Sequence, residues 1–228
     1  MAKTPKPEKP APARDADTDA SAETRYPRRT ERRRRTRMKI QEVAAELFSK
    51  AGFAATTMQA IADEADIHVT TLFMHFNSKN DLATSLVASA IDALRERALS
   101  ARETTPFFDF FKDEALSFAR PGRDFTQPAA SLWSVLRNDR ELAFAWSDYE
   151  QGQKDIYAEY IAAEYSMSRE SDFLPDLVAS LLVASTILPH RKWLEAPGKR
   201  TLEDEISEAI TLSQNAARHM LKSSGRKS

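Results

Sequence analysis

The stretch "AAELFSKAGFAATTMQAIADEADIHVTTLFMHFNSKNDL", residues 44–82, decides the fold. Its first apolar residues recur at i, i+3, i+4 and i+7, which predicts a helix from about residue 37 that Gly52 closes in a left-handed conformation. Thr57 stands where the N-cap of a second, short helix is expected. A turn follows, and residues 68–76 form a third helical pattern. The stretch therefore predicts two short helices joined by a tight turn behind a longer one.

The end of this stretch marks the start of a fourth helix. Ser78 and Asp81 have the S-x-x-D spacing of a capping box, and an apolar pattern continues from Leu82 to Leu94. Lys79 lies at the join between the third and fourth helices. We expect Leu72, Phe76 and Leu82 to pack this corner.

The rest of the chain is predicted to be helical nearly to its end, with no alternating strand pattern. Five more helices are expected. The first begins after Pro106 and ends near residue 120, and the other four span about 126–137, 139–166, 172–192 and 201–222. The fold class is all-α, with about nine helices. Residues 1–29 hold few large apolar side chains and are expected to be disordered.

The charge is concentrated in one segment. Residues 25–39, "RYPRRTERRRRTRMK", hold nine basic residues and one acidic residue, which leaves 24 basic and 33 acidic residues elsewhere, a net charge of −9. A basic segment on an acidic chain indicates a polyanionic partner. The alternative is a solubilising tail.

Several other functions are excluded or lack a signal. The chain has no cysteine, and its five glycines, at 52, 122, 152, 198 and 225, are too scattered for a phosphate-binding loop. The helical metal motifs H-E-x-x-H and E-x-x-H do not occur, so no catalytic residue, metal or cofactor is predicted and an enzyme is not expected. The longest apolar run, 177–188, has 12 residues, too few to span a bilayer, and a cytoplasmic protein is expected.

Two short helices joined by a turn, with small polar groups on the second, are typical of a helix-turn-helix. Residues 44–82 also resemble the DNA-binding domain of TetR-family transcriptional regulators along their whole length. The resemblance implies that the start of the recognition helix meets base edges, and that a second set of residues contacts phosphates or braces those contacts. The first set is His68, Val69, Thr70 and Thr71; the second is Thr57, Phe73, His75 and Lys79.

Three residues depart from the family's usual pattern. Asp66 stands where glycine is usual, which a turn tolerates because aspartate can bond its own backbone. Phe73 replaces tyrosine and loses one hydroxyl that could reach a phosphate. Thr70 replaces a residue that is commonly glycine and adds a hydroxyl and a methyl group where the backbone would approach the bases closely.

The recognition helix, 68–75, contains no arginine or lysine, so a bidentate arginine–guanine contact is unavailable there. Threonine methyls on thymine and His68 on a base acceptor are the remaining options. We expect affinity to come largely from a basic arm, with Arg32, Arg33, Arg34 and Arg35 at a helix N-terminus, where they oppose the dipole. The arm is predicted to follow the DNA backbone or to enter the minor groove.

Aromatic residues are concentrated between 105 and 160, and at helical spacing such residues most often form a core. The alternative, which the resemblance favours, is a pocket for a small, apolar or aromatic effector. Its predicted lining is Phe110, Phe111, Trp133, Arg137, Phe144 and Tyr149.

The predicted domains are a disordered extension (1–29), a helix-turn-helix domain with its basic arm (30–80) and a helical effector-binding and dimerisation domain (81–228). The resemblance implies a homodimer through the last two helices. The predicted function is a ligand-responsive repressor that binds a palindromic DNA operator. The alternative is a helical binding or scaffold protein that binds nucleic acid without sequence specificity.

Overall fold

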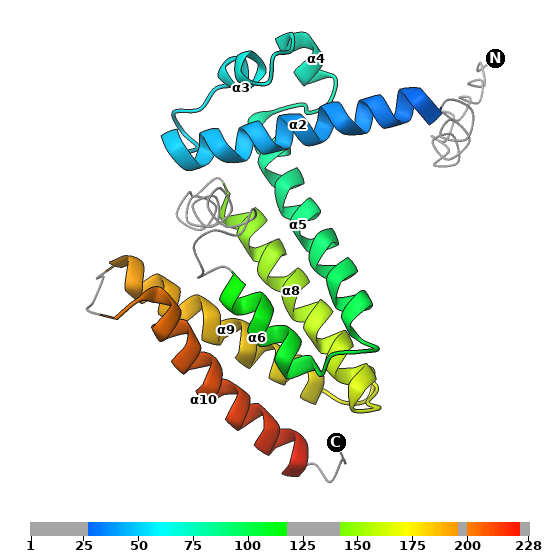
Figure 1. Cartoon of the computed structure of the whole chain (residues 1–228), viewed down its shortest axis with the longest axis vertical. Coiled ribbons are helices and arrows are strands. Elements are labelled where there is room, and N and C mark those ends of the chain that lie inside the picture. The colour runs from blue at the N-terminus through cyan, green and yellow to red at the C-terminus, as the bar shows by residue number, and fades with distance from the viewer. Residues whose placement is uncertain (1–26, 118–141, 196–199, 224–228) are drawn as a thin grey trace, which may run out of the picture. The chain divides into compact units, whose positions relative to one another are not determined.

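The computed structural model describes residues 27–117, 142–195 and 200–223 (Figure 1). Across these ranges there are eight helices and no strand, so the all-α prediction is confirmed. The helices are α2 (Pro27–Ala51), α3 (Met58–Glu64), α4 (Val69–Phe73), α5 (Lys79–Ala101), α6 (Phe107–Ser117), α8 (Ala143–Glu164), α9 (Leu174–Glu195) and α10 (Leu202–Ser223). The helix predicted at 126–137 lies outside the described residues.

The chain forms two compact units, one ending at Lys39 and the other beginning at Ile40. We call residues 27–39 the arm and the described residues from 40 onward the body. The predicted domain boundary near residue 80 falls in the first turn of α5.

The first helix begins about ten residues earlier than the expected start near 37, so its first three residues fall in the segment predicted to be disordered. The prediction was wrong because it followed apolar periodicity, and the arginine-rich segment has no apolar residues to count. Arginine is a good helix former, and proline is favoured at the first helical position. Arg32–Arg35 consequently lie inside the helix and not at its N-terminus, where Arg28 and Arg29 stand.

One hydrophobic cluster of the body holds the helix-turn-helix together. It joins the second half of α2, α3, α4, the start of α5 and the first turns of α8. Its fully buried members include Ile40, Phe48, Ile61, Leu72 and Leu82. Burying one such side chain stabilises the fold by roughly 1.5–3 kcal/mol, so the corner is packed as a small core.

A second cluster fills the space among α5, α6, α8, α9 and α10. Its aromatic rings pack edge to face, for example Phe107 on Tyr160 and Phe111 on Tyr157, with ring centroids 5.4 and 5.5 Å apart. Two polar groups of α8 tie it to the start of α6: the Tyr160 hydroxyl donates to the carbonyl of Thr105, and a Glu164 carboxylate oxygen accepts from the Phe107 N–H, both at 2.6 Å.

Helices α5 and α8 approach closely at Gly152. A Cβ atom placed there would lie 2.8 Å from Cδ1 of Ile91, so a larger residue would require the Ile91 side chain to move. Arg169, between α8 and α9, pairs with Asp155 and Asp176 and fixes this end of the bundle. None of the described helices has the length and apolar character that crossing a membrane would require.

Candidate nucleic-acid interface

Helix α3 is the first helix of the helix-turn-helix, and its start is fixed by Thr57. The Thr57 hydroxyl accepts a hydrogen bond from the Ala60 N–H at 3.1 Å, which confirms the predicted N-cap. Ile61 and Ala62 are buried on the inner face of the helix. Thr57 itself is exposed.

The turn after α3 is a Schellman motif centred on Asp66. The Ile67 N–H donates to the Ala62 carbonyl at 3.0 Å and the Asp66 N–H donates to the Asp63 carbonyl at 3.1 Å. Asp66 has a φ of +53°, in the left-handed region that glycine enters most easily. This explains why the family pattern has glycine here, and why aspartate, one of the few other residues that tolerates the region, can replace it.

Helix α4 is short, but its helical turn continues to Phe76 through hydrogen bonds from the N–H groups of His75 and Phe76 to the Leu72 carbonyl. Leu72 and Phe76 are buried on the inner side. Among the residues predicted to meet base edges, His68 and Thr70 are exposed, whereas Val69 and Thr71 are half-buried. Val69 packs against the cluster that includes Leu72.

The start of α5 is capped as predicted, with one difference. The Ser78 hydroxyl accepts from the Asp81 N–H at 3.0 Å. The Asp81 carboxylate, however, accepts from the N–H of Asn77 at 2.7 Å, one residue before the position that a capping box would use. The corner between α4 and α5 is therefore held from both sides.

Lys79 is bound to the turn between α2 and α3. Its ammonium donates to the carbonyls of Phe53, Ala54 and Thr56 at 2.6, 3.4 and 2.9 Å, and it lies 4.2 Å from the centre of the Phe53 ring. These three bonds use all three N–H groups of the ammonium. The resemblance implied that Lys79 either contacts a phosphate or braces residues that do. This geometry agrees with bracing, because a phosphate contact would have to replace one of the three bonds.

Phe73 and His75, also predicted to contact or brace phosphates, differ in exposure. Phe73 is 49% exposed. His75 is half-buried, with its ring centroid 6.4 Å from that of Phe76. Met74, between them, is 71% exposed, and the sequence reasoning missed it. Met74 lies four residues after Thr70, and this spacing places the two side chains on the same face of a helix, which could have indicated its exposure.

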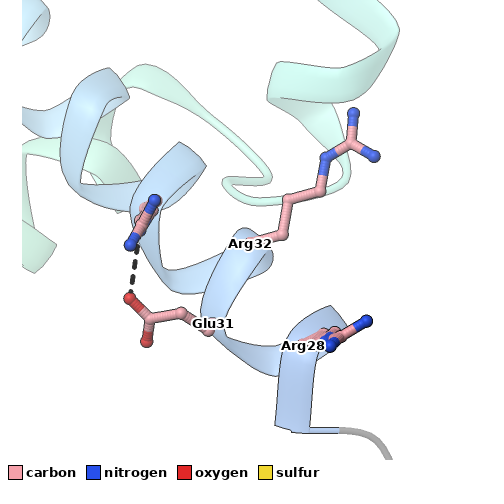
Figure 2. A pocket seen from close by; sticks show the side chains of 4 residues that line it. Arg28, Glu31 and Arg32 are labelled. Carbon is pink, nitrogen blue, oxygen red and sulfur yellow. Dashed lines mark hydrogen bonds and ion pairs between the residues drawn. The ribbon is translucent and has the colours of Figure 1, made fainter.

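The arm presents arginines along an exposed helix. Glu31 is the only acidic residue of 27–39, and it accepts hydrogen bonds from Arg34 and Arg35, both at 3.1 Å. The bonds from Arg34 and Arg35 lower the pKa of Glu31. Figure 2 shows a hollow lined by Arg28, Glu31, Arg32 and Arg35, in which Arg28 and Arg32 point away from Glu31. The predicted residues Arg32, Arg33, Arg34 and Arg35 are all exposed.

The predicted effector-binding residues are only partly described. Phe110 and Phe111 are buried in the aromatic cluster, and Tyr149 is buried beside Trp146, with its hydroxyl accepting from the Gln153 amide at 3.2 Å. Burial raises the pKa of Tyr149. Phe144 is 78% exposed on α8. Trp133 and Arg137 lie outside the described residues.

Two short helices joined by a Schellman turn, with one side of the second exposed, define the class: a helix-turn-helix DNA-binding protein. A family profile described as bacterial regulatory proteins, tetR family, matches residues 40–86, the segment that contains both helices. Through this segment the chain belongs to the TetR family of transcriptional regulators. This membership confirms the predicted regulator, and the family is not one of enzymes.

Similar proteins support the same class over longer stretches. The chain is 26% identical over 190 residues to the HTH-type transcriptional regulator TcmR of Streptomyces glaucescens, covering 78% of this chain and 83% of that protein. It is 38% identical over 81 residues to the HTH-type transcriptional repressor KstR of Mycobacterium tuberculosis (strain ATCC 25618 / H37Rv), covering 34% of this chain and 36% of that one. The structure of the transcriptional regulator FadR from Bacillus subtilis in complex with stearoyl-CoA superposes with a TM-score of 0.59 at 17% identity, over 77% of this chain and 96% of that one, and shows the fold.

Proposed function

We propose that this regulator is a repressor that binds a palindromic operator as a homodimer in the cytoplasm and responds to a small effector. The single observation that carries the proposal is the exposed side of α4, opposite Leu72 and Phe76. The second helix of a helix-turn-helix lies in the major groove, and a twofold dimer matches a palindrome. KstR, which matches this chain over the DNA-binding segment, is named as a repressor.

Helices α9 and α10 are the proposed dimer interface. They pack on each other and still expose large apolar side chains: Leu177 and Leu188 on α9 are 45% and 46% exposed, and Leu212 on α10 is 65% exposed. Pairing of two such helices with their copies gives a four-helix interface that would cover these leucines. Leu212→Glu would place a charge in the interface and shift the chain toward a monomer in light scattering.

The effector is proposed to bind beside the aromatic cluster of α6 and α8. The buried rings of Phe110, Phe111 and Tyr149 provide apolar walls, and the Tyr149 hydroxyl provides a polar group that stays protonated because burial raises its pKa. FadR, a structural neighbour, holds stearoyl-CoA, a ligand with a long apolar chain. Native mass spectrometry of the purified full chain would detect a copurifying apolar molecule.

The arm is proposed to follow the phosphate backbone. A helix is about 10–12 Å wide, whereas the minor groove of B-DNA is about 6 Å wide, so a helical arm does not fit the groove. Exposed arginines that line a hollow, such as Arg28 and Arg32, suit contacts with phosphate oxygens. The residues predicted from the resemblance, Thr57 and His68 to Thr71, remain the proposed contacts of the body.

A competition experiment separates this function from nonspecific binding. Genomic DNA fragments bound by the full chain are selected, and the preferred fragment is then competed against random duplex of equal length. A specific protein binds its site 10³–10⁷-fold more tightly than random duplex as a typical range. A ratio near one would support the nonspecific binding or scaffold protein instead.

A further inference from the structure

The exposed side of α4 is an apolar stripe. Thr70, Phe73 and Met74 have the i, i+3, i+4 spacing that places side chains on one side of a helical turn. Leu72 and Phe76 are buried on the other side. Thr70 is exposed, Phe73 is 49% exposed and Met74 is 71% exposed. We call Thr70, Phe73 and Met74 the reading stripe.

The reading stripe offers little polar chemistry for base edges. Residues 69–74, "VTTLFM", contain no charged, amide or carboxylate side chain. Bidentate hydrogen bonds to guanine or adenine need arginine, lysine, asparagine or glutamine, so this stretch cannot make them. The groups that it does present are a threonine methyl and hydroxyl, a phenyl ring and a thioether, and a single hydroxyl cannot make a bidentate contact. The apolar group on the floor of the major groove is the C5-methyl of thymine.

We propose that the reading stripe recognises thymine methyl groups, so that each operator half-site carries thymine at the positions that Thr70, Phe73 and Met74 contact. The inference rests on the proposed function, because it needs α4 in the major groove. DNA is the occupant that the site favours, since the stripe lies within residues 40–86, which match the family profile, and on the helix that enters the groove. Phe73 has no hydroxyl to give to a phosphate, so its exposed ring is left for apolar contact.

The expected size of the effect follows from the apolar area of one methyl group. Burying a group of this size is worth a factor of roughly four in affinity. A homodimer that contacts one methyl in each half-site would therefore lose about 16-fold when both are removed. Uracil in place of thymine removes the methyl and leaves every hydrogen-bonding group unchanged.

The experiment selects bound sequences with the full chain from two random duplex libraries, one made with thymine and one with uracil. The expected result is a motif with fixed thymines in the thymine library. The same motif, synthesised with uracil at those positions, should bind roughly fourfold more weakly for each contacted methyl. Equal affinity of the thymine and uracil forms of the selected motif would overturn the inference.

Variants assign the effect to the stripe. Met74→Ala should shrink the ratio of thymine to uracil affinity, and Phe73→Ala should do the same at another position of the motif. Leu99→Ala is the matched control, because Leu99 is a 54% exposed apolar residue on α5, outside the helix-turn-helix. It should leave the ratio unchanged. If the ratio of thymine to uracil affinity is undiminished in both Met74→Ala and Phe73→Ala, other residues recognise the methyl groups. That result would refute the assignment of methyl recognition to the reading stripe.

The selection also separates this inference from the proposed function. If no motif is enriched in the thymine library, the chain binds no sequence specifically and both the function and the inference fail. If a motif is enriched but is indifferent to uracil, the proposed function stands and only methyl recognition fails.

Discussion

The arm and helix α4 are the two parts of the chain proposed to meet DNA, and their chemistry is opposite. The arm, 27–39, holds seven arginines, one lysine and one glutamate, whereas residues 69–74 hold no charge. The arm is a helix with charges exposed to solvent, and α4 is held by a packed core and capped turns. Charge gives affinity for any duplex, whereas contacts with base edges in the groove give selectivity. The proposed function therefore assigns the two tasks to separate segments of the chain.

The largest effect is expected from neutralising the arm. Changing Arg28, Arg29, Arg32 and Arg33 to glutamine keeps the helix propensity and removes four charges. Each lost phosphate contact reduces the steepness of the fall of log K with log[salt] by about 0.9. The loss of affinity relative to the unchanged chain should therefore be about 100-fold larger at 50 mM salt than at 200 mM salt. Fluorescence anisotropy with the selected duplex measures both slopes.

The control for the arm variant is Lys112→Gln with Lys222→Gln, two exposed lysines on α6 and α10. These changes should leave the slope unaltered. A slope that stays the same in the four-arginine variant would show that the arm is a solubilising segment. The arm would then not be one of the segments that contact DNA.

Substitution of Lys79 tests whether a cation in the helix-turn-helix stabilises the fold instead of contacting DNA. Its three bonds to carbonyls predict that Lys79→Met lowers the free energy of unfolding by about 2–3 kcal/mol, because hydrogen bonds to charged groups contribute about 1.5–3 kcal/mol. Urea denaturation measures this loss. Lys50→Met, which removes only an exposed pair with Glu46, should cost under about 0.5 kcal/mol.

The salt dependence of DNA binding then distinguishes bracing from phosphate contact. If Lys79 braces the turn, the slope measured with folded Lys79→Met matches that of the unchanged chain. A slope lower by about 0.9, with little loss of stability, would show instead that Lys79 contacts a phosphate.

Asp66 tests how far the turn before α4 is strained. Asp66→Gly should raise the free energy of unfolding by about 0.5 kcal/mol, because glycine has no Cβ penalty at positive φ, and Asp66→Ala should lower it by about 1 kcal/mol. A change of 0.5 kcal/mol corresponds to about 1–2 °C in the thermal midpoint of a chain of this size, which calorimetry resolves.

Ser166 provides the matched control, because it occupies the equivalent Schellman position after α8 with the same φ of +53°. Ser166→Gly should stabilise the chain by a similar amount. DNA affinity should stay unchanged in both glycine variants if the turn only supports α4. A loss of affinity confined to Asp66→Gly would instead show that the carboxylate takes part in binding.

The sequence predicted the local features of the helix-turn-helix and missed those that depend on distant partners. Gly52, Thr57 and Ser78 were recognised as caps because a cap is decided within four residues, and the structure shows all three. The binding of Lys79 to the Phe53 carbonyl could not be predicted, since the two residues are 26 positions apart and only the folded corner brings them together. The start of α2 was missed because a helix without apolar residues has no periodicity to detect.

The smallest effect concerns Glu31, the one carboxylate among the arginines of the arm. Its bonds from Arg34 and Arg35 lower its pKa from the ordinary value of 4.5. A lowered pKa means that the pairing stabilises the arm helix above pH 4.5 and that this contribution is lost as the pH falls through the lowered value. The Cα chemical shifts of residues 28–36 in the full chain should therefore move toward coil values as the pH falls below 4.5 and through this lowered pKa.

Glu31→Gln separates this titration from others in the chain. Glutamine has nearly the same helix propensity but cannot titrate, so the Cα shifts of the variant should stay flat over the same pH range. The variant also leaves Arg34 and Arg35 without an intrahelical carboxylate, and at neutral pH it should bind random duplex and the selected motif more tightly by the same small factor. A gain limited to the selected motif would mean that the arm reads sequence, and the division of tasks between the arm and α4 would then be wrong.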